Sequence, residues 1–372
     1  LKVVDAEGTT IANDYSGSLI DLRERLVAYR ANNYLKVVTI DGRTIVNEYS
    51  ASDVKLRPGV VAYSVNNYFK VTRFDGTTIV NEYNVSEYEL SPRIVAYIAS
   101  NYLKMVRIED GVTFVNEYNV SDYSIGKQVV VYRVNNYFKI VRLDDGRTII
   151  NEYNVTDFEM GPSLVVYRVN NYLKAVQVED GAIILNEYNV SDYHISQSVL
   201  AYRVNNYFKV LRLSDGATII NIYNVTEYEV TAELVAFTSN NYLRVVRIED
   251  NVPLVNVYSA TEYQLNDKSV AYVANNYFHV VRSEDGRQVV QAYNVTSYLF
   301  NYYGDQVAYV THNYLYLEDV AGDRNLLQAY NANRYKFYNM LFYYISNGYV
   351  VGVDQDGREV SRNPGETLPG DR

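Results

Sequence analysis

The sequence predicts an all-β protein made of about ten tandem antiparallel meander units, each about 35 residues long. A fixed repeat, a strand-rich composition and turn residues at regular positions support this prediction. The motif Asn-Asn-Tyr or a close variant recurs ten times, and consecutive copies are 34 to 37 residues apart. A period of this size is typical of a stacked array of one small supersecondary unit. The tyrosine of the motif is found at Tyr34, Tyr68, Tyr102, Tyr137, Tyr172, Tyr207, Tyr242, Tyr277, Tyr314 and Tyr349.

The copy at residues 130–163 shows the expected elements in order. Val, Ile, Tyr, Phe and Thr dominate between Asn, Asp and Gly, which is strand composition interrupted by hairpin turns. No stretch keeps a helical period of about 3.6 residues. Three strands are predicted, at 130–134, 137–143 and 147–153, followed by a weaker fourth strand at 154–160 and a short Gly-Pro-Ser link.

Differences among the copies predict the type of both turns. The first turn is Asn-Asn in most units but Asn347-Gly348 in the last, and Asn-Gly is the preferred pair of a type I′ turn. We therefore expect both residues of this turn to have positive φ. The second turn has Gly at an αL position, replaced once by Asn251. Asp41-Gly42 forms a two-residue loop, whereas Asp144-Asp145-Gly146 is one residue longer.

The turns fix a strand register in which Tyr137 faces Tyr153 and Lys139 faces Asn151. Both faces of the resulting sheet carry an apolar row and an aromatic row, whereas a sheet wetted on one side would alternate cleanly. Each small sheet is therefore expected to pack against a neighbour on both faces. One face is predicted to read Val134–Tyr137–Tyr153, Tyr132–Lys139–Asn151 and Val130–Val141–Ile149.

With its weak fourth strand (Tyr-Glu-Leu, Phe-Glu-Met or Tyr-His-Ile), the unit resembles a β-propeller blade with strand one innermost. The chain resembles bacterial propeller repeats of the Val-Ala-Tyr … Tyr-Phe-Lys-Val … Asp-Gly kind over nearly its whole length. Propeller blades usually need about 40–45 residues, and rings have about 4–8 blades. Both a closed or partly closed ring and an open twisted stack are therefore expected alternatives.

The end segments do not complement each other as shared propeller blades do. Residues 1–23 are predicted to supply strands two, three and four, and residues 341–361 strands one, two and three. An open stack would need capping or end-to-end polymerisation to cover its terminal sheets. The array is expected to span 1–361 with an incomplete first unit and an irregular unit at 298–334, followed by an irregular tail at 362–372. The opening Leu-Lys-Val-Val matches the middle of later repeats, which indicates a processed or excerpted chain.

Composition excludes several classes of function. The net charge of −10 argues against nucleic-acid binding, because phosphates need a basic surface. Without cysteine, neither disulfides nor a thiolate metal site is possible. No apolar run approaches the ~18 residues of a membrane span, so membrane insertion is not expected.

No catalytic or cofactor site is predicted. His194, His279 and His312 occupy three different repeat positions, and the acidic turns lack the ligand set of a calcium loop. Nucleophile-elbow and phosphate-loop motifs are absent from the sequence. Catalytic residues should break the repeat, but the recurring glutamates obey it and are expected to pair with Lys and Arg such as Arg133. These glutamates are Glu48, Glu82, Glu117, Glu152 and Glu187.

Candidate N-glycosylation sites recur in the corner after strand three. Asn-Val-Ser/Thr is an acceptor sequence that requires an exposed asparagine and an exporting cell. Alternatively, Asn and Ser/Thr are turn residues that bond to their own backbone. The six candidates are Asn84, Asn119, Asn154, Asn189, Asn224 and Asn294.

Tyrosine contributes 41 residues, in rows that repeat along the array, and tryptophan is absent. Three rows, represented by Tyr132, Tyr137 and Tyr153, are predicted to lie inside the sheet–sheet contacts. The row on the weak outer strand is the candidate for stacking on a ligand. It comprises Tyr88, Tyr123, Tyr193, Tyr228 and Tyr263.

These patterns favour a non-enzymatic structural or adhesive repeat protein outside the cell or on its surface. It is expected to self-associate by sheet stacking, as part of a fibre or appendage that is glycosylated at the Asn-Val-Ser/Thr sites. The alternative is a soluble propeller lectin or interaction platform that binds one ligand, such as a glycan, per repeat. A polysaccharide-active enzyme is a third hypothesis, because carboxylates are plentiful.

Overall fold

The computed structural model describes residues 1–5, 7–23 and 25–371. These residues form 42 β-strands and no helix, which confirms the all-β prediction. The strands are arranged in one two-stranded and ten four-stranded antiparallel sheets, none of which closes on itself among the described residues. The chain divides into two compact units, Leu1–Asn170 with Lys174–Asn186 and Asn171–Leu173 with Glu187–Arg372. The boundary between the units falls within the sixth sheet in chain order.

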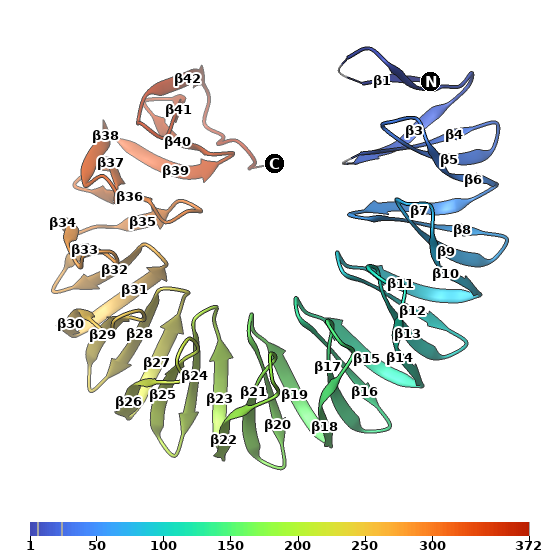
Figure 1. The fold of residues 1–372 in the computed structure, drawn as a ribbon. Coiled ribbons are helices and arrows are strands. Elements are labelled where there is room, and N and C mark those ends of the chain that lie inside the picture. The colour runs from blue at the N-terminus through green and yellow to red at the C-terminus, as the bar shows by residue number, and fades with distance from the viewer. Residues whose placement is uncertain (6, 24, 372) are drawn as a thin grey trace. The chain divides into compact units, whose positions relative to one another are not determined.

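The first six sheets in chain order contain β1 to β22 (Figure 1). Their bounds are β1 (Lys2–Val4) and β2 (Thr10–Asn13); β3 (Ser18–Arg23), β4 (Leu26–Ala31), β5 (Tyr34–Thr39) and β6 (Thr44–Tyr49); β7 (Ser52–Arg57), β8 (Val60–Val65), β9 (Tyr68–Arg73) and β10 (Thr78–Tyr83); β11 (Val85–Leu90), β12 (Ile94–Ala99), β13 (Tyr102–Arg107) and β14 (Thr113–Tyr118); β15 (Val120–Ile125), β16 (Val129–Val134), β17 (Tyr137–Arg142) and β18 (Thr148–Tyr153); β19 (Val155–Met160), β20 (Leu164–Val169), β21 (Tyr172–Gln177) and β22 (Ile183–Tyr188).

The remaining five sheets belong to the second unit. Their strands are β23 (Val190–Ile195), β24 (Val199–Val204), β25 (Tyr207–Arg212) and β26 (Thr218–Tyr223); β27 (Val225–Val230), β28 (Leu234–Ser239), β29 (Tyr242–Arg247) and β30 (Pro253–Tyr258); β31 (Ala260–Asn266), β32 (Ser269–Ala274), β33 (Tyr277–Arg282) and β34 (Gln288–Tyr293); β35 (Ser297–Phe300), β36 (Gln306–Thr311), β37 (Tyr314–Asp319) and β38 (Arg324–Tyr330); β39 (Ala332–Tyr338), β40 (Leu341–Ser346), β41 (Tyr349–Val353) and β42 (Glu359–Pro364).

The weak strand of each repeat belongs to the following sheet, which corrects the predicted unit. β19 follows β18 in the chain, yet β19 pairs with β20, and β18 remains the edge of the sheet β15–β18. Only Asn154 separates β18 from β19, and its φ is 65°. One residue is too short for a hairpin loop, so the chain passes directly to the next sheet. A blade with strand one innermost would require strand one at the edge of its sheet. Here the weak strand occupies that edge instead.

The predicted turn conformations are confirmed. Asn135 and Asn136 have φ values of 49° and 65°, and every other turn of this type has two residues with positive φ. This is the type I′ geometry that matches the twist of a hairpin. In the second turn Gly146 has φ 71° and Asn251 has φ 61°, which confirms the αL position.

The predicted register is confirmed except next to the second turn. Tyr137 pairs with Tyr153 and Lys139 with Asn151, as expected. Val141, however, pairs with Thr148 instead of Ile149, because a β-bulge lies between Ile140 and Val141. The same bulge lies between Val37 and Val38 in a repeat with the shorter loop, so it does not depend on loop length.

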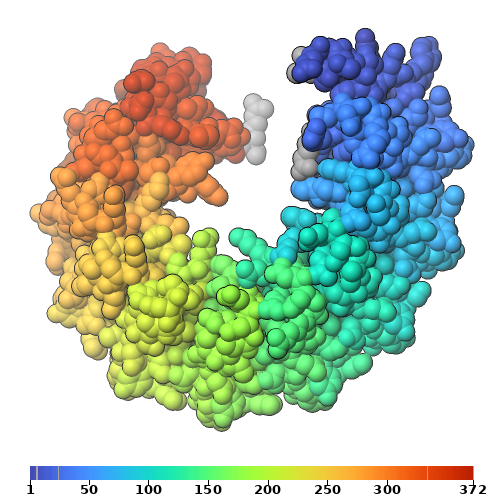
Figure 2. Space-filling view, in the orientation of Figure 1, coloured from blue at the N-terminus to red at the C-terminus, as the bar shows by residue number. Residues whose placement is uncertain are grey.

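Each sheet that has a neighbour on both sides within its unit buries apolar side chains on both faces, which confirms the stacking prediction. In the sheet β7–β10, Val61 and Tyr63 pack toward the preceding sheet, whereas Val60, Ala62 and Phe69 pack toward the next one. Successive sheets of each unit share one such core layer, and Figure 2 shows them packed directly against one another. Because successive side chains of a central strand point to opposite faces of the sheet, each central strand contributes to two core layers.

The irregular repeat and the tail are more ordered than predicted. The repeat at 298–334 still supplies a full second strand, β37, and contributes to two complete four-stranded sheets. The last strand, β42, continues to Pro364, three residues beyond the predicted end of the array at Ser361. In the following segment Leu368 is buried, and Arg334 donates to the Glu366 carbonyl over 2.9 Å. Arg372, Ala6 and Glu24, which fall within the predicted array and tail, lie outside the described residues.

Candidate functional site

The Asn-Asn turns and the single-residue connections between sheets lie at the same end of the strands. The backbone N–H of Asn154 donates to the carbonyl of Asn136 over 2.9 Å, and equivalent bonds recur along both units. We call this end the Asn rim. The opposite end, with the Asp-Gly turns and the short links that follow the weak strands, is called the Asp rim.

A pair of tyrosines stands beside each turn of the Asn rim in nine repeats. Tyr137 at the start of β17 and Tyr153 at the end of β18 are cross-strand neighbours with ring centroids 5.3 Å apart. All nine pairs have centroid distances of 5.1–5.3 Å and steeply inclined rings, a favourable edge-on arrangement. The pairs are Tyr34–Tyr49, Tyr68–Tyr83, Tyr102–Tyr118, Tyr137–Tyr153, Tyr172–Tyr188, Tyr207–Tyr223, Tyr242–Tyr258, Tyr277–Tyr293 and Tyr314–Tyr330.

These two tyrosine rows are exposed, which corrects the prediction that they lie inside the sheet–sheet contacts. Tyr137 is 43% and Tyr153 is 55% exposed, and of the paired residues only Tyr314 falls below the exposed range. Alternation along a strand identifies the face of a side chain but not how far the neighbouring sheet reaches. The pairs sit in the last row before the turn, beyond the shared core layer. Proximity to the turn is the sequence signal that would have indicated their exposure.

The third predicted row is buried as expected. Tyr132 is 3% exposed, and its hydroxyl lies 3.4 Å from the Glu117 carboxylate of the preceding sheet. Burial, reinforced by this carboxylate, raises the pKa of Tyr132. The recurring glutamates pair with lysines of the next sheet, as Lys70 does with Glu48 at 2.6 Å. Arg133 does not join them but pairs with Asp122 at 2.8 Å.

The row proposed for ligand stacking is half-buried between neighbouring sheets. The Tyr88 ring lies 4.4 Å from Phe69 of the preceding sheet, and Tyr228 lies 4.6 Å from Phe208 in the same way. Burial also raises the pKa of Tyr263 to about 12. The rings thus contribute to sheet packing and offer less surface than the pairs on the Asn rim. The five residues Tyr88, Tyr123, Tyr193, Tyr228 and Tyr263 all share this half-buried state.

The candidate glycosylation residues are the single-residue connections of the Asn rim. Asn84, Asn119, Asn154, Asn189, Asn224 and Asn294 are all exposed and have φ between 57° and 65°. Asn tolerates this αL conformation well. In two repeats Ser50 and Ser259 take the same conformation, while a hydroxyl residue, Ser52 or Thr261, is kept two positions later. The asparagine and the hydroxyl therefore vary separately, which favours backbone roles, and glycosylation stays a prediction.

A small cavity of about 300 Å³ opens on the Asn rim between the sheets β7–β10 and β11–β14. Its lining includes Ser64, Asn67 and Asn84. Ser64 occupies the repeat position of Arg133, whose guanidinium lies 5.3 Å from the Phe158 ring. The cavity is the space that an arginine fills in the sister repeat. Hydroxyl and amide groups therefore line an opening next to the pair Tyr68–Tyr83.

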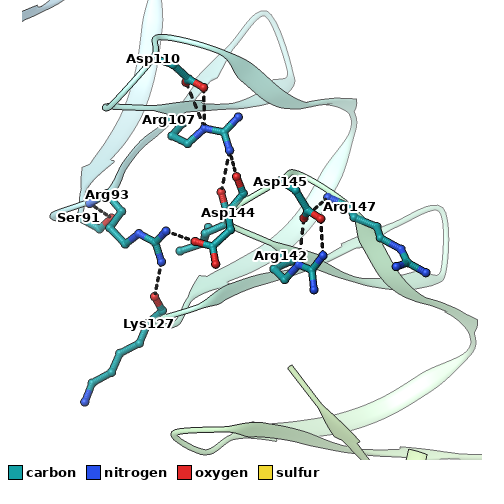
Figure 3. Close-up of polar contacts among 10 residues, drawn as sticks. Ser91, Arg93, Arg107, Asp110, Lys127, Arg142, Asp144, Asp145 and Arg147 are labelled. Atoms are coloured by element: carbon teal, nitrogen blue, oxygen red, sulfur yellow. Dashed lines mark hydrogen bonds and ion pairs between the residues drawn. The ribbon is translucent and has the colours of Figure 1, made fainter. Parts of the chain in front are cut away.

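Arginine–aspartate contacts dominate the Asp rim. Arg142 bonds to Asp145 of its own turn, and Arg107 reaches the backbone carbonyls of the next turn, among them Leu143 at 3.4 Å (Figure 3). Arg93 bonds to the Asp144 carboxylate. In the second unit, the Arg212 guanidinium lowers the pKa of the equivalent Asp215 carboxyl to about 2. These carboxylates hold turns and neighbouring sheets together.

The histidines and carboxylates show no arrangement for metal binding. His279 stacks on Tyr272 with ring centroids 4.8 Å apart, His312 bonds to Thr311, and His194 is exposed on β23. In the described part of the chain, no three His, Cys, Asp or Glu side chains form a potential metal site. Within the same residues there is no helix with the length and apolar character needed to span a membrane.

Comparisons with known proteins give only distant structural similarities. No family model and no curated protein matches the chain. Hsv2 of Kluyveromyces lactis is similar with 12% identity and a TM-score of 0.32, over 66% of this chain and 98% of that chain. A eukaryotic initiation factor matches with 11% identity and a TM-score of 0.35, over 92% and 96%. PorZ of Porphyromonas gingivalis matches with 8% identity and a TM-score of 0.27, over 94% and 58%. Proteins with propeller folds are among these neighbours, and no functional argument follows from them.

Proposed function

We propose that the chain is a non-enzymatic adhesive repeat protein that binds its partner through the Asn rim, outside the cell or on its surface. The observation that supports this proposal is the ninefold recurrence of a tyrosine pair, exposed except for Tyr314, beside a turn that is Asn-Asn in seven of these repeats. Nine of the eleven sheets formed by the described residues present the same small contact surface. A repeated surface of this kind suits a partner that is itself repetitive.

The chemistry of the Asn rim is that of a recognition surface. Tyrosine supplies a large, rigid ring with a polar tip, and asparagine supplies adaptable hydrogen bonds. The apolar tyrosine ring suits the C–H face of a sugar residue, and the asparagine amide suits its hydroxyl groups, so the surface fits a polysaccharide. One contact per sheet is weak, but several contacts on one polymer raise the overall affinity by about 10²–10⁴.

Binding to insoluble polysaccharides, with cellulose and chitin as the first probes, tests this proposal. Alanine at the more exposed tyrosine of four pairs should reduce the bound fraction by about tenfold or more, because avidity depends on the number of contacts. These residues are Tyr49, Tyr83, Tyr118 and Tyr153, each 55–57% exposed, so their loss should leave folding intact. Arg147→Ala on the Asp rim is the matched control and should bind normally.

Negative-stain images of the same samples separate adhesion to a polymer from self-association. Filaments that disappear in the four-tyrosine variant would make a second copy of this chain the partner of the Asn rim, as in a fibre. Discrete particles that bind polysaccharide support the adhesive function. If the wild-type protein neither forms filaments nor binds polysaccharide, the proposal is refuted.

A further inference from the structure

The repeat is interrupted at one place in the second unit. Tyr277 and Tyr314 are 37 residues apart, the longest step in the array. The extra residues enlarge the link between β35 and β36, which spans 301–305, whereas the equivalent link between β15 and β16 spans 126–128. The insertion contains Tyr302 and Tyr303, which are 94% and 52% exposed. Departures from a near-uniform repeat are where a single specialised site is expected.

The inserted loop is fixed in position. Asn301 Oδ1 accepts the backbone N–H groups of Asp305 at 3.1 Å and of Gln306 at 3.2 Å. Lys268 of the preceding sheet pairs with Asp305 at 3.2 Å. Gly304 has φ 69°, and a Cβ there would lie 2.3 Å from Asn266, so only glycine allows this close approach. The exposed tyrosines are therefore presented by a preorganised loop.

A cavity of about 250 Å³ lies between this loop and the hairpin that joins β39 to β40. Tyr303, Tyr338 and Met340 contribute apolar surface to it. Gln306 and Gln355 contribute amide groups, and the Gln306 side chain, which is 8% exposed, is fixed by a 2.8 Å bond to the Gln355 carbonyl. Apolar walls with a few fixed polar groups are typical of a small-molecule site.

The hairpin beside the cavity has a strained backbone. Asn339 and Met340 both have positive φ, 47° and 64°. The Asn rim satisfies the same demand mainly with Asn, Ser or Gly, but methionine has no such tolerance for the αL region. Met340 is 65% exposed at the edge of the cavity. Strain and exposed apolar surface together are features of binding sites.

The lining indicates the class of ligand. Among the described residues, no charged side chain lines this cavity, whereas the equivalent cavity between the sheets β11–β14 and β15–β18 is lined by Glu89, Arg93 and Lys127. A neutral ligand with one apolar face and several hydroxyl groups fits phenol rings combined with amides. We propose that this cavity binds one neutral sugar residue, with its ring against Tyr302 and Tyr303 and its hydroxyls on the amides. This site is separate from the Asn rim and does not depend on it.

Ligand-observed NMR with soluble methyl glycosides of glucose, mannose, galactose and N-acetylglucosamine tests the proposal. At least one glycoside should bind with a Kd of about 1 mM, the range expected for a ligand of this size. Tyr303→Ala and Gln355→Ala should each weaken binding by about fivefold or more. Leu19→Ala is the matched control, because Leu19 lies outside both proposed sites and is 52% exposed, as Tyr303 is. Tyr153→Ala is measured beside it and reports on binding at the Asn rim.

Each outcome of this experiment decides the proposal. Loss of binding in Tyr303→Ala with normal binding in Leu19→Ala supports it. Absence of binding for all four glycosides overturns it, as does binding that Tyr303→Ala leaves unchanged. Loss of glycoside binding in Tyr153→Ala alone would place the sugar on the Asn rim. That result would overturn this inference and support the proposed adhesive function. Circular dichroism of each variant confirms that it is folded.

Discussion

Lys104 donates from Nζ to Glu82 Oε2 of the preceding sheet over 2.9 Å, and the Tyr97 hydroxyl lies 3.5 Å from the same oxygen. This inter-sheet contact recurs along the first unit and into the start of the second, from Lys70–Glu48 to Lys209–Glu187. Both side chains are less than a third exposed. The contact thus ties each sheet to the next at a point where the core layer meets solvent.

Breaking one such pair should destabilise the protein. Glu82→Ala leaves the half-buried Lys104 ammonium and the buried Tyr97 hydroxyl without their shared acceptor, at a cost of about 1–2 kcal/mol in the free energy of unfolding. Urea denaturation measures this change. The double variant Glu82→Ile with Lys104→Met should recover part of the loss, because of the polar groups in this contact only the Tyr97 hydroxyl is then left without its acceptor. A double variant as unstable as the single one would contradict the pairing argument.

Stability should decrease at alkaline pH. The pKa values of the buried tyrosines Tyr97, Tyr132 and Tyr309 are raised, mainly by burial, and that of Tyr263 is raised to about 12. The unfolded chain therefore loses these protons first, and the stability that they contribute is present below about pH 10 and lost as pH rises toward the folded values. Unfolding curves recorded at increasing pH test this, and Tyr132→Phe should be less sensitive to alkali than the wild-type protein.

The cavity at Ser64 should be closed by copying its sister repeat. Ser64→Arg adds the side chain that the sister repeat carries as Arg133, whose guanidinium lies over the Phe158 ring. Tyr88 is the equivalent of Phe158, but the Lys55 ammonium already lies 4.2 Å from its ring centroid. The double variant Ser64→Arg with Lys55→Ser, which has the sister pattern, should therefore raise stability by about 0.5–1 kcal/mol. Thermal unfolding measures it. The single variant should gain less, and an equal gain in both would show that Lys55 does not compete.

Relief of strain at Met340 should stabilise the protein. Met340→Gly keeps φ 64° without steric cost and should raise stability by about 1 kcal/mol. The same change removes an apolar wall of the cavity between the inserted loop and β39–β40, so glycoside binding should weaken. Thermal unfolding and ligand-observed NMR on one variant report both effects. Higher stability with unchanged affinity would remove Met340 from the sugar site.

The Arg–Asp contacts of the Asp rim should make the acidic turns independent of calcium. Asp145 is already bonded to Arg142 and to the backbone N–H of Arg147. Asp145→Ala should lower the melting temperature, since the turn and its arginine lose their shared partner. Addition of calcium or of a chelator should leave the wild-type melting temperature unchanged. A melting temperature that rises with calcium would show that the turns bind the ion.

The turns and the strand register of this fold were predictable from sequence, whereas the connection of each weak strand and the exposure of the tyrosine pairs were not. Asn135-Asn136 reveals its conformation because two consecutive positive φ values restrict the residue type directly. The partner of the weak strand β19 depends instead on the direction of the chain after Asn154. The repeat period does not indicate this direction. Exposure of Tyr137 depends on the reach of the adjacent sheet. The inserted Tyr302-Tyr303 was visible as a 37-residue step, but its cavity required the position of the β39–β40 hairpin.

Because each weak strand pairs with the first strand of the following repeat, no single repeat is self-contained. A segment cut at residues 130–163 would carry β19 away from its partner β20 and leave β16 without β15. Duplication within the regular part of the chain has no such difficulty, since every seam is alike. Copying any 35 consecutive residues there adds one complete sheet and one more tyrosine pair, wherever the copy begins. A gene for this protein is thus free to change length by recombination, and the number of tyrosine pairs changes with it.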